Sequence, residues 1–350
     1  MKKYDFLFLD FMVQNSHKVY CNALISAINE VATSVVVEKK DYIYDKDESH
    51  SVFTIKTKEI DGNYPVIARY NTVYNFFQAI KAVEEYCFDK VVVLGYDPVM
   101  FYFMIDKLKK IGKVYLVQHH QLDEVSCSRI KRAIWDTYKN DVNHILLDDS
   151  IRYVAADCLS IDKKKIHTFP HPYMYVKEKK QNGDDDLIRV LSISQSNDVI
   201  QMKKLVEYEQ ETGFLRKNNI QIIIRHNDKV DTSNLKAFYE INGFLSIDEY
   251  IHLNNMADIV FMPFPLNYKI RCSGTLIDAL SARKKVISSN IIESAAYAKM
   301  FPSICKIYDN VSQVGHQILA LNMEKNKNDY NKFIKYQDKM KVIGVHEICN

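Results

Sequence analysis

The sequence contains 350 residues, of which 47% are hydrophobic and 26% are charged, so it is long enough to bury about two cores of ordinary size. Its formal net charge is only +3, which argues against a dedicated nucleic-acid-binding protein. The seven cysteines are scattered and include no C-x-x-C pair. This pattern argues against a disulfide framework or a zinc site and favours a reducing compartment.

The N-terminal residues, MKKYDFLFLDF, are typical of a first core strand rather than a signal peptide, because Asp5 and Asp10 interrupt the apolar run. No stretch approaches the roughly 20 apolar residues that a membrane span requires. We therefore expect a cytoplasmic protein. A peripheral contact with the inner membrane surface, through lysine-rich surfaces, stays open.

Apolar strands alternate with periodic helices along the first half of the chain. Strands are expected at 4–9, 34–37, 90–94, 113–117, 142–147 and 165–169, and helices at 19–31, 71–86, from 97 onward, 126–139 and 149–159. The stretch 39–65 is charged and has no clear register. Repeated alternation with uninterrupted apolar strands predicts an α/β fold with a doubly wound parallel sheet.

A domain boundary is expected after Pro172, where the polar run KEKKQNGDDD at 177–186 forms a linker. The second half repeats the alternation, with strands at 187–194, 220–225, 259–262 and 286–288 and helices at 200–211, 233–241, 246–256, 294–301 and 311–323. We therefore predict a first domain at 1–172, a second at 173–325, and a tail at 326–350. A helix at 330–340 of this tail would pack back on the first domain.

The stretch Asp258 to Ser289 is read as strand, basic loop, helix start, helix and strand. The first N–H groups of a helix have no partner within it, so Ser273 as N-cap and Gly274 beside it would let an anion approach the amides. Asp278 lies one turn further on, where its carboxylate could accept hydrogen bonds from ribose hydroxyls. The plainer alternative, in which Ser273 only caps the helix and Asp278 only complements its dipole, stays open.

Other candidate site residues lie at strand ends or near helix starts. The strand at 113–117 runs into His119 and His120, and ligands of parallel sheets bind beyond the carboxyl ends of strands. Because successive side chains of a strand alternate, we expect one of the two histidines to be structural. Arg225 ends an apolar strand. Lys203 and Lys204 are adjacent on a helix, so at most one of them is expected to bind a phosphate.

The second half resembles the nucleotide-binding domain of GT-B glycosyltransferases, particularly the bacterial retaining enzymes of glycosyltransferase group 1 (family 4). The strongest match is SGTLIDALSARKKVIS at 273–288, which is similar to their "SG…(D/E)A(L/M)…GKPVI" segment. The others are LSIS at 191–194 with the two lysines beyond it, Phe244 with the segment 246–265, QHH at 118–120, and HTFPHPY at 167–173.

The resemblance implies two Rossmann-like domains that face each other across a cleft. The first would bind the acceptor and the second a nucleotide-diphosphate sugar, which is the donor substrate, with no metal and no separate cofactor. By resemblance, the diphosphate would face Ser273, Gly274 and Thr275, and the ribose would be held by Asp278. The growing phosphate charge would be neutralised by Lys203 or Lys204 together with Arg225, and the transferred sugar would be hydrogen-bonded by His119 or His120.

The sequence departs from the family's Glu-x7-Glu pattern. Ile270 stands where the first Glu is expected, and Asp278 replaces the second. Arg271 or Tyr268 could substitute for the missing carboxylate. The identity of the sugar and the retaining mechanism therefore stay open.

Our leading hypothesis is a metal-independent hexosyltransferase of the retaining type. It would act on a polysaccharide or glycolipid-linked acceptor in the synthesis of a bacterial capsule or O-antigen. Two alternatives use the same fold: a nucleotide-sugar 2-epimerase and a non-catalytic nucleotide-sugar-binding subunit.

Overall fold

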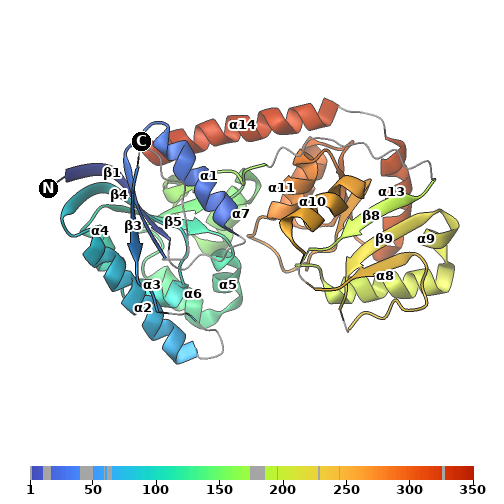
Figure 1. Cartoon of the computed structure of the whole chain (residues 1–350), viewed down its shortest axis with the longest axis horizontal. Helices are drawn as coiled ribbons and strands as arrows, with labels where there is room; N and C mark the ends of the chain where they lie inside the picture. Colours follow the sequence, from blue (N-terminus) through green and yellow to red (C-terminus); the bar gives the residue numbers. More distant parts are fainter. Residues whose placement is uncertain are drawn as a thin grey trace. The chain divides into compact units, whose positions relative to one another are not determined.

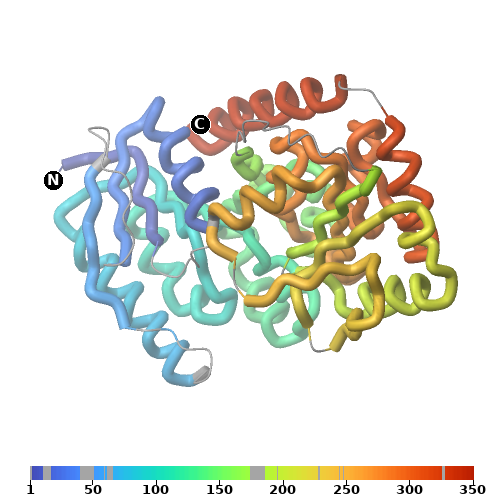
Figure 2. The backbone as a smooth tube through the Cα atoms, turned by 45° about the vertical axis from the view of Figure 1, so that its right-hand side comes forward, coloured from blue at the N-terminus to red at the C-terminus, as the bar shows by residue number. Residues whose placement is uncertain are grey.

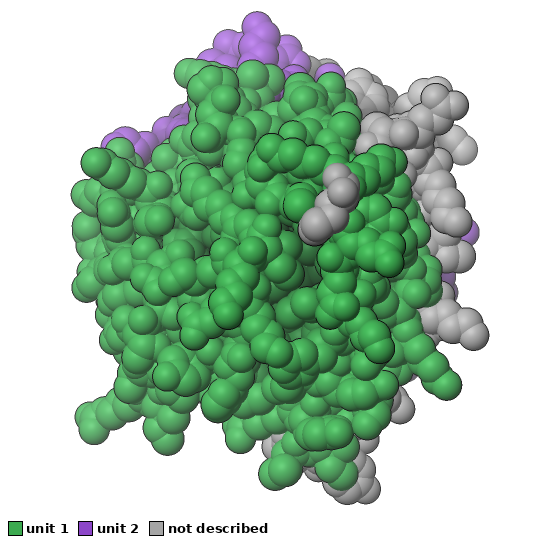
Figure 3. Space-filling model, turned by 90° about the vertical axis from the view of Figure 1, so that its left-hand side faces the viewer, with its two compact units in different colours: residues 1–172, 270–272, 339–350 green, residues 173–269, 273–338 purple. Residues whose placement is uncertain are grey.

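The computed structural model describes residues 2–10, 17–39, 50–58, 60, 65–173, 186–194, 196–227, 229–243, 245–324 and 328–350. The chain forms two compact units, which Figure 3 colours separately. Unit 1 comprises Met1–Pro172, Ile270–Cys272 and Lys339–Asn350, and unit 2 comprises Tyr173–Lys269 and Ser273–Asp338. The stretch Asp258 to Ser289 therefore contributes residues to both units.

Unit 1 is built on a seven-stranded parallel sheet in the order β3-β2-β1-β4-β5-β6-β7 (Figure 1). Its strands are β1 (Lys2–Asp10), β2 (Ser34–Lys39), β3 (His50–Ile55), β4 (Tyr86–Val93), β5 (Lys113–Gln118), β6 (Asn143–Leu146) and β7 (Ile166–Thr168). β1 lies inside the sheet, where Phe8 is in register with Val36 of β2 and Val92 of β4. The crossover helices of a parallel sheet cover both of its faces, which explains the unbroken apolar runs in the sequence.

The helices of unit 1 are α1 (Lys18–Asn29), α2 (Pro65–Ala82), α3 (Pro98–Tyr102), α4 (Ile105–Lys109), α5 (Gln121–Cys127), α6 (Arg129–Asp136) and α7 (Arg152–Leu159), with 3-10 turns η2 (Asp149–Ile151) and η3 (Lys163–Lys165). On one face of the sheet, Phe6 and Phe8 share a core with α1 and with Ile348 near the C-terminus. Leu7 and Leu9 are equally buried, and the alternation of strand side chains places them on the opposite face. Helices therefore cover both faces.

Unit 2 contains a six-stranded parallel sheet in the order β10-β9-β8-β11-β12-β13. Figure 1 labels β8 and β9 of this sheet, and Figure 2 traces the backbone of the same chain in the colours of the sequence. Its strands are β8 (Ile188–Ser192), β9 (Ile220–Arg225), β10 (Phe238–Ile241), β11 (Ile259–Met262), β12 (Lys285–Ser289) and β13 (Cys305–Tyr308). The predicted doubly wound, parallel α/β architecture is confirmed in both halves of the chain.

The helices of unit 2 are α8 (Val199–Thr212), α9 (Phe214–Lys217), α10 (Ile247–Met256), α11 (Gly274–Ser281), α12 (Ile292–Met300), α13 (Val314–Met323) after the 3-10 turn η4 (Val311–Gln313), and the first part of α14 (Asn328–Cys349). Ile259 and Phe261 of β11 pack in one core with α8, α9 and α13. Val260 and Met262 pack in the other with α11 and α12. The period-2 alternation of one strand thus fixes which helices lie on which face.

One sequence prediction about a single element is wrong, and two predicted helices have different bounds. The helix expected at 233–241 is replaced by turns and β10, because Phe238 and Ile241 pair with Ile222 and Arg225 of β9. The helix expected at 71–86 is α2, which begins and ends earlier and leaves Tyr86 to open β4. The helix expected at 330–340 continues to Cys349 as α14.

Some sequence predictions fall on residues outside the described ranges. They are the linker at 177–185, the family match at Phe244 and residues 40–49 of the stretch without clear register. None of the described helices is long and apolar enough to cross a lipid bilayer.

Candidate functional site

The strand order of unit 2 reverses between β8 and β11. From β8 the chain continues outward to β9 and β10, and it then returns to add β11, β12 and β13 on the other side. In open parallel sheets, ligands bind beyond the carboxyl ends of the strands at such a switch point. The segments that leave β8, β9 and β11 are therefore the candidate ligand-binding elements of this unit.

The N-terminus of α11 follows β11 and lies at this edge. Ser273 is its N-cap, and the Ser273 side chain accepts a hydrogen bond from the backbone N–H of Leu276 at 3.3 Å. The backbone N–H of Ser273 itself donates to both carboxylate oxygens of Glu293, at 3.1 and 2.9 Å. Within the described part of the chain, the N–H groups of Gly274 and Thr275 have no acceptor. Two amides at the positive end of a helix are thus available to an anion.

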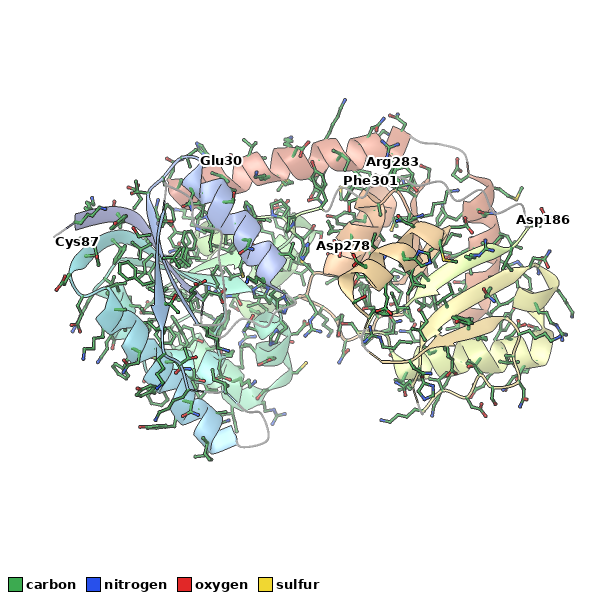
Figure 4. All side chains as sticks on the ribbon, in the orientation of Figure 1. Glu30, Cys87, Asp186, Asp278, Arg283 and Phe301 are labelled. Atoms are coloured by element: carbon green, nitrogen blue, oxygen red, sulfur yellow. The ribbon has the colours of Figure 1, made fainter. Side chains whose placement is uncertain are left out.

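Asp278 lies one turn into α11, and Figure 4 labels it there. Burial raises the pKa of its carboxyl to about 7, so the protonated and ionised forms coexist near neutral pH. Asp278 also contributes, after burial, to raising the pKa of the Tyr250 hydroxyl of α10 to about 12. The carboxyl is therefore in a half-buried, water-poor environment beside a helix N-terminus.

Arg225 is the last residue of β9 and lines a hollow of about 90 Å³ at the carboxyl ends of β8 and β9. The other polar residues that line this hollow are Ser192, Ser194, Asn197, His226 and Asn227. Asn197 is fixed by hydrogen bonds from its amide nitrogen to the carbonyl and hydroxyl oxygens of Ser192, both at 3.0 Å. The hollow therefore presents one guanidinium, the His226 imidazole and several hydroxyl and amide groups.

The bend after β11 is held by side chains and backbone from two neighbouring elements. The Phe264 carbonyl accepts the Gln201 side-chain amide of α8 at 2.5 Å and the Ser289 hydroxyl at 2.7 Å. The Pro263 carbonyl accepts the backbone N–H of Asp198 at 2.6 Å. These bonds fix the loop that leads toward α11. Lys203 and Lys204, also on α8, are both exposed.

In unit 1, His119 and His120 follow β5 and have different surroundings, as the alternation of side chains predicts. His119 is buried, and its Nε2 lies 3.0 Å from the carbonyl oxygen of Leu94. Since a carbonyl only accepts, Nε2 carries the proton, and the buried Nδ1 has no partner within the described residues. His120 lies 3.0 Å from Glu124, and this hydrogen bond is the main cause that lowers the pKa of Glu124 to about 2.

His17, which our sequence analysis did not single out, belongs to the same cluster. It precedes α1, and its ring centroid lies 4.2 Å from that of His119. Burial lowers the pKa of His17 to about 4 and that of His119 well below its usual value, so both rings are neutral at pH 7. The sequence does contain a signal for His17, because this residue follows the first strand as His119 follows β5. The carboxyl ends of parallel strands lie at the same edge of a sheet, so residues that follow two such strands can meet.

The segment Ile270–Cys272 belongs to unit 1, although its neighbours in sequence belong to unit 2. The Ile270 backbone N–H donates to Asp123 at 2.9 Å, and Nε of Arg271 lies 3.6 Å from the other oxygen of that carboxylate. The Ile270 side chain is buried. The structure thus places Arg271 against Asp123 in unit 1, whereas Ser273, Gly274, Thr275 and Asp278 gather on α11 of unit 2.

Solved structures similar to this chain identify its fold. The Anabaena protein Alr3699/HepE, in complex with UDP and glucose, has a TM-score of 0.66 at 10% identity, covering 100% of this chain and 97% of that chain. Arabidopsis thaliana UGT89C1, complexed with UDP-L-rhamnose, has a TM-score of 0.63 at 9% identity and covers 99% of both chains. WaaG, a glycosyltransferase involved in lipopolysaccharide biosynthesis, has a TM-score of 0.59 at 11% identity and covers 98% of both.

These similarities show that the chain has the GT-B fold, as expected from the sequence. No protein-family model matches the sequence, and no curated protein matches it. Membership of glycosyltransferase group 1 therefore stays a prediction.

Proposed function

We propose that this chain is a glycosyltransferase that transfers a hexosyl group from a nucleotide-diphosphate sugar to a saccharide or lipid-linked saccharide. The observation that carries the proposal is the N-terminus of α11. It offers the N–H groups of Gly274 and Thr275, which have no acceptor among the described residues, followed one turn later by Asp278, at the switch point of a Rossmann-type sheet.

In this proposal the diphosphate lies against the Gly274 and Thr275 amides, and Asp278 accepts hydrogen bonds from the ribose hydroxyls. Charge builds up on the diphosphate as the sugar leaves, and preorganised donors stabilise it more in the transition state than in the ground state. Arg225, at the carboxyl end of β9, would supply a positive charge to the diphosphate. Lys203 and Lys204 are longer-range candidates, because both side chains are exposed on α8.

The histidines of unit 1 would act on the transferred sugar. Nε2 of His119 already donates to Leu94 and its Nδ1 is buried, so Nδ1 would accept a hydrogen bond from a sugar hydroxyl only after neighbouring side chains move. His120 is more exposed and held by Glu124, which suits a donor to the sugar. Unit 1 would hold the acceptor, and synthesis of a bacterial capsule or O-antigen is the pathway we propose.

The test is calorimetric titration of UDP, GDP, dTDP and CMP in the presence of EDTA. UDP comes first, because a similar structure contains UDP and glucose. We expect one diphosphate to bind without metal, and Asp278→Ala to weaken it roughly 10- to 100-fold, the value of a hydrogen bond to a charged group. Arg225→Gln should weaken it by a similar factor. Asp248→Ala and Arg216→Gln, which change exposed residues of unit 2, should not.

Absence of binding by all four nucleotides, or equal binding by Asp278→Ala and Asp248→Ala, would contradict the proposed site. With the donor known, turnover separates three functions of one fold. Transfer to a saccharide acceptor identifies a glycosyltransferase, and NMR of the product anomer distinguishes retention from inversion. Conversion of the donor sugar to its 2-epimer without acceptor identifies an epimerase. Donor binding without hydrolysis or transfer identifies a binding subunit.

A further inference from the structure

The sheet of unit 2 ends at β10, which pairs only with β9 among the described strands. The Ala237 and Ile241 carbonyls accept backbone N–H groups of β9. Backbone groups of successive strand residues point to opposite edges, so those of Phe238 and Glu240 point away from β9. The Phe238 N–H donates to Leu235 at 3.0 Å. The Phe238 carbonyl and the Glu240 N–H have no partner within the described part of the chain.

These outward-facing groups match those of a second β10. Two copies can pair as antiparallel strands about a twofold axis at Tyr239, which places Phe238 of one opposite Glu240 of the other. The Glu240 N–H of each copy then donates to the Phe238 carbonyl of the other. A twofold axis at Phe238 would need the N–H that Leu235 already accepts, and an axis at Glu240 would set two carboxylates opposite each other. The axis at Tyr239 is therefore the one that uses both outward-facing groups.

The side chains of this edge also fit the pairing. Tyr239 is 57% exposed, and its ring would lie beside that of the other Tyr239, because facing residues that share no hydrogen bond approach closely. Lys236, which is exposed, and Glu240 line the same hollow beside β10. An antiparallel pair brings the start of one strand beside the end of the other, so the Lys236 ammonium approaches the Glu240 carboxylate of the second copy.

β10 lacks the features that normally protect an edge strand. Natural edge strands carry proline or outward-directed charges, which oppose pairing with another chain. The sequence of β10 is FYEI, and its one charged residue is Glu240. The Glu240 carboxylate is held within its own chain by the Thr232 hydroxyl and by the His226 ring. The strand itself therefore has no lysine or proline that would keep a second copy away.

We propose that β10 pairs with β10 of a second copy and joins the two unit 2 sheets into one continuous sheet. β10 has only 4 residues, so the contact is smaller than a permanent interface, and the dimer dissociates on dilution. β9 and β8 separate β10 from the switch point between β8 and β11. The candidate donor site therefore lies away from the pairing edge.

Sedimentation velocity of the full-length protein over a series of concentrations tests this pairing. We expect a reversible monomer–dimer equilibrium in the wild type. Tyr239→Lys and Tyr239→Glu should each weaken association at least about tenfold, because like charges then face each other across the twofold axis. A mixture of these two variants should associate as a heterodimer, because a lysine then faces a glutamate. Tyr153→Lys is the control, at a tyrosine of unit 1 that is 65% exposed, and should associate like the wild type.

Lys236→Glu provides a second arm that leaves the strand itself unchanged. It places a glutamate near Glu240 of the second copy and should weaken the dimer, whereas Lys217→Glu, at an exposed position of α9, should not. A wild type that is monomeric at every concentration would overturn the proposal and leave the edge to a strand of a different protein. A dimer that persists in Tyr239→Lys would overturn it in favour of another face. Failure of the two Tyr239 variants to associate when mixed would overturn the pairing about Tyr239.

Discussion

The buried carboxylate of Glu293 accepts the backbone N–H of Ser273 with both of its oxygens, at 3.1 and 2.9 Å. Glu293 is only 1% exposed and lies in the first turn of α12, where the helix dipole favours a negative charge. The residue that caps α11 is thus held from the N-terminus of the next helix. Because Glu293 takes the Ser273 amide, the amides left for a ligand are those of Gly274 and Thr275.

We predict that Glu293→Ala destabilises unit 2 by about 1–3 kcal/mol, because it leaves the half-buried Ser273 amide without this acceptor. Glu293→Gln should cost less, since its carbonyl oxygen can still accept. Denaturant unfolding measures the free energy, and hydrogen exchange of the Ser273 amide locates the change. Glu211→Ala, which alters an exposed residue of α8, is the control. Equal stability of Glu293→Ala and Glu211→Ala would show that the Glu293–Ser273 contact contributes little.

Asp278 gives unit 2 a pH-dependent stability. Its folded pKa, raised to about 7 by burial, exceeds the ordinary value of 3.8, so the folded chain binds the proton more tightly. The stability that the protonated carboxyl contributes is present at acid pH and is lost as the pH rises through 7. We predict that Asp278→Asn, which cannot ionise, is more stable than the wild type at about pH 8, by on the order of 2–4 kcal/mol.

Urea unfolding at acid and mildly alkaline pH measures this effect. The variant should gain on the wild type as the pH rises, and Asp248→Asn, at an exposed position, should not. Parallel pH profiles for wild type and Asp278→Asn would mean that the Asp278 carboxyl is better hydrated than its burial indicates.

His144 provides a prediction of the opposite sign in unit 1. Its ring is fully buried, with Nδ1 2.9 Å from the Gln118 side-chain nitrogen and Nε2 2.8 Å from the Lys139 carbonyl oxygen. Nε2 therefore donates to the carbonyl and Nδ1 accepts from the amide, which requires a neutral ring. Burial lowers the pKa of His144 to about 4. Its contribution is present above the unfolded pKa of about 6.5 and is lost as the pH falls toward 4.

Between roughly pH 7 and 5, the wild type should therefore lose about 2 kcal/mol of stability through His144, and His144→Gln should not show this loss. The variant should also be less stable than the wild type at pH 7, because the buried ring is gone. Urea unfolding at the two pH values measures the difference. His252→Gln, at an exposed position of α10, should leave the pH dependence unchanged. A variant that loses the same amount of stability at both pH values would contradict the assignment of a neutral His144.

The parts of the fold that could be predicted are those encoded within a few consecutive residues. Runs such as 90–94 are uninterrupted because parallel strands are buried on both faces, so the alternation of strands and helices was visible. The N-cap of α11 could also be predicted, because a cap is encoded by adjacent residues. The Ser273 side chain does accept a hydrogen bond from the Leu276 amide. β10 was not visible, because its strand state depends on pairing with β9 rather than on local propensity.

Contacts between residues far apart in sequence could not be predicted. Glu293 reaches Ser273 across 20 residues, and His17 meets His119 only because β1 and β5 end at the same edge of one sheet. Ile270 stands in the sequence where the family's first Glu is expected, and the sequence gives no sign that its amide is bonded to Asp123, 147 residues away. Nothing in the local pattern distinguishes such a contact from a site residue.

The C-terminal end of α14 supports a final prediction. Ile348 is fully buried in the core that contains Phe6 and Phe8 of β1 and the apolar face of α1. Ile348→Ala removes three carbons from a packed site, and we expect a loss of about 2–4 kcal/mol in unit 1. Val342→Ala, at a position of the same helix that is 71% exposed, should change the stability by less than about 0.5 kcal/mol.

Hydrogen exchange assigns a change in stability to one of the two units, whereas an unfolding curve measures the size of the change without locating it. In Ile348→Ala, the amides of α1 (Lys18–Asn29) should exchange faster, whereas those of α8 (Val199–Thr212) in unit 2 should be unchanged. Faster exchange in α8 as well would mean that unit 2 draws stability from the α14 core. Unchanged exchange in α1 would mean that the end of α14 does not support the first unit, despite its burial.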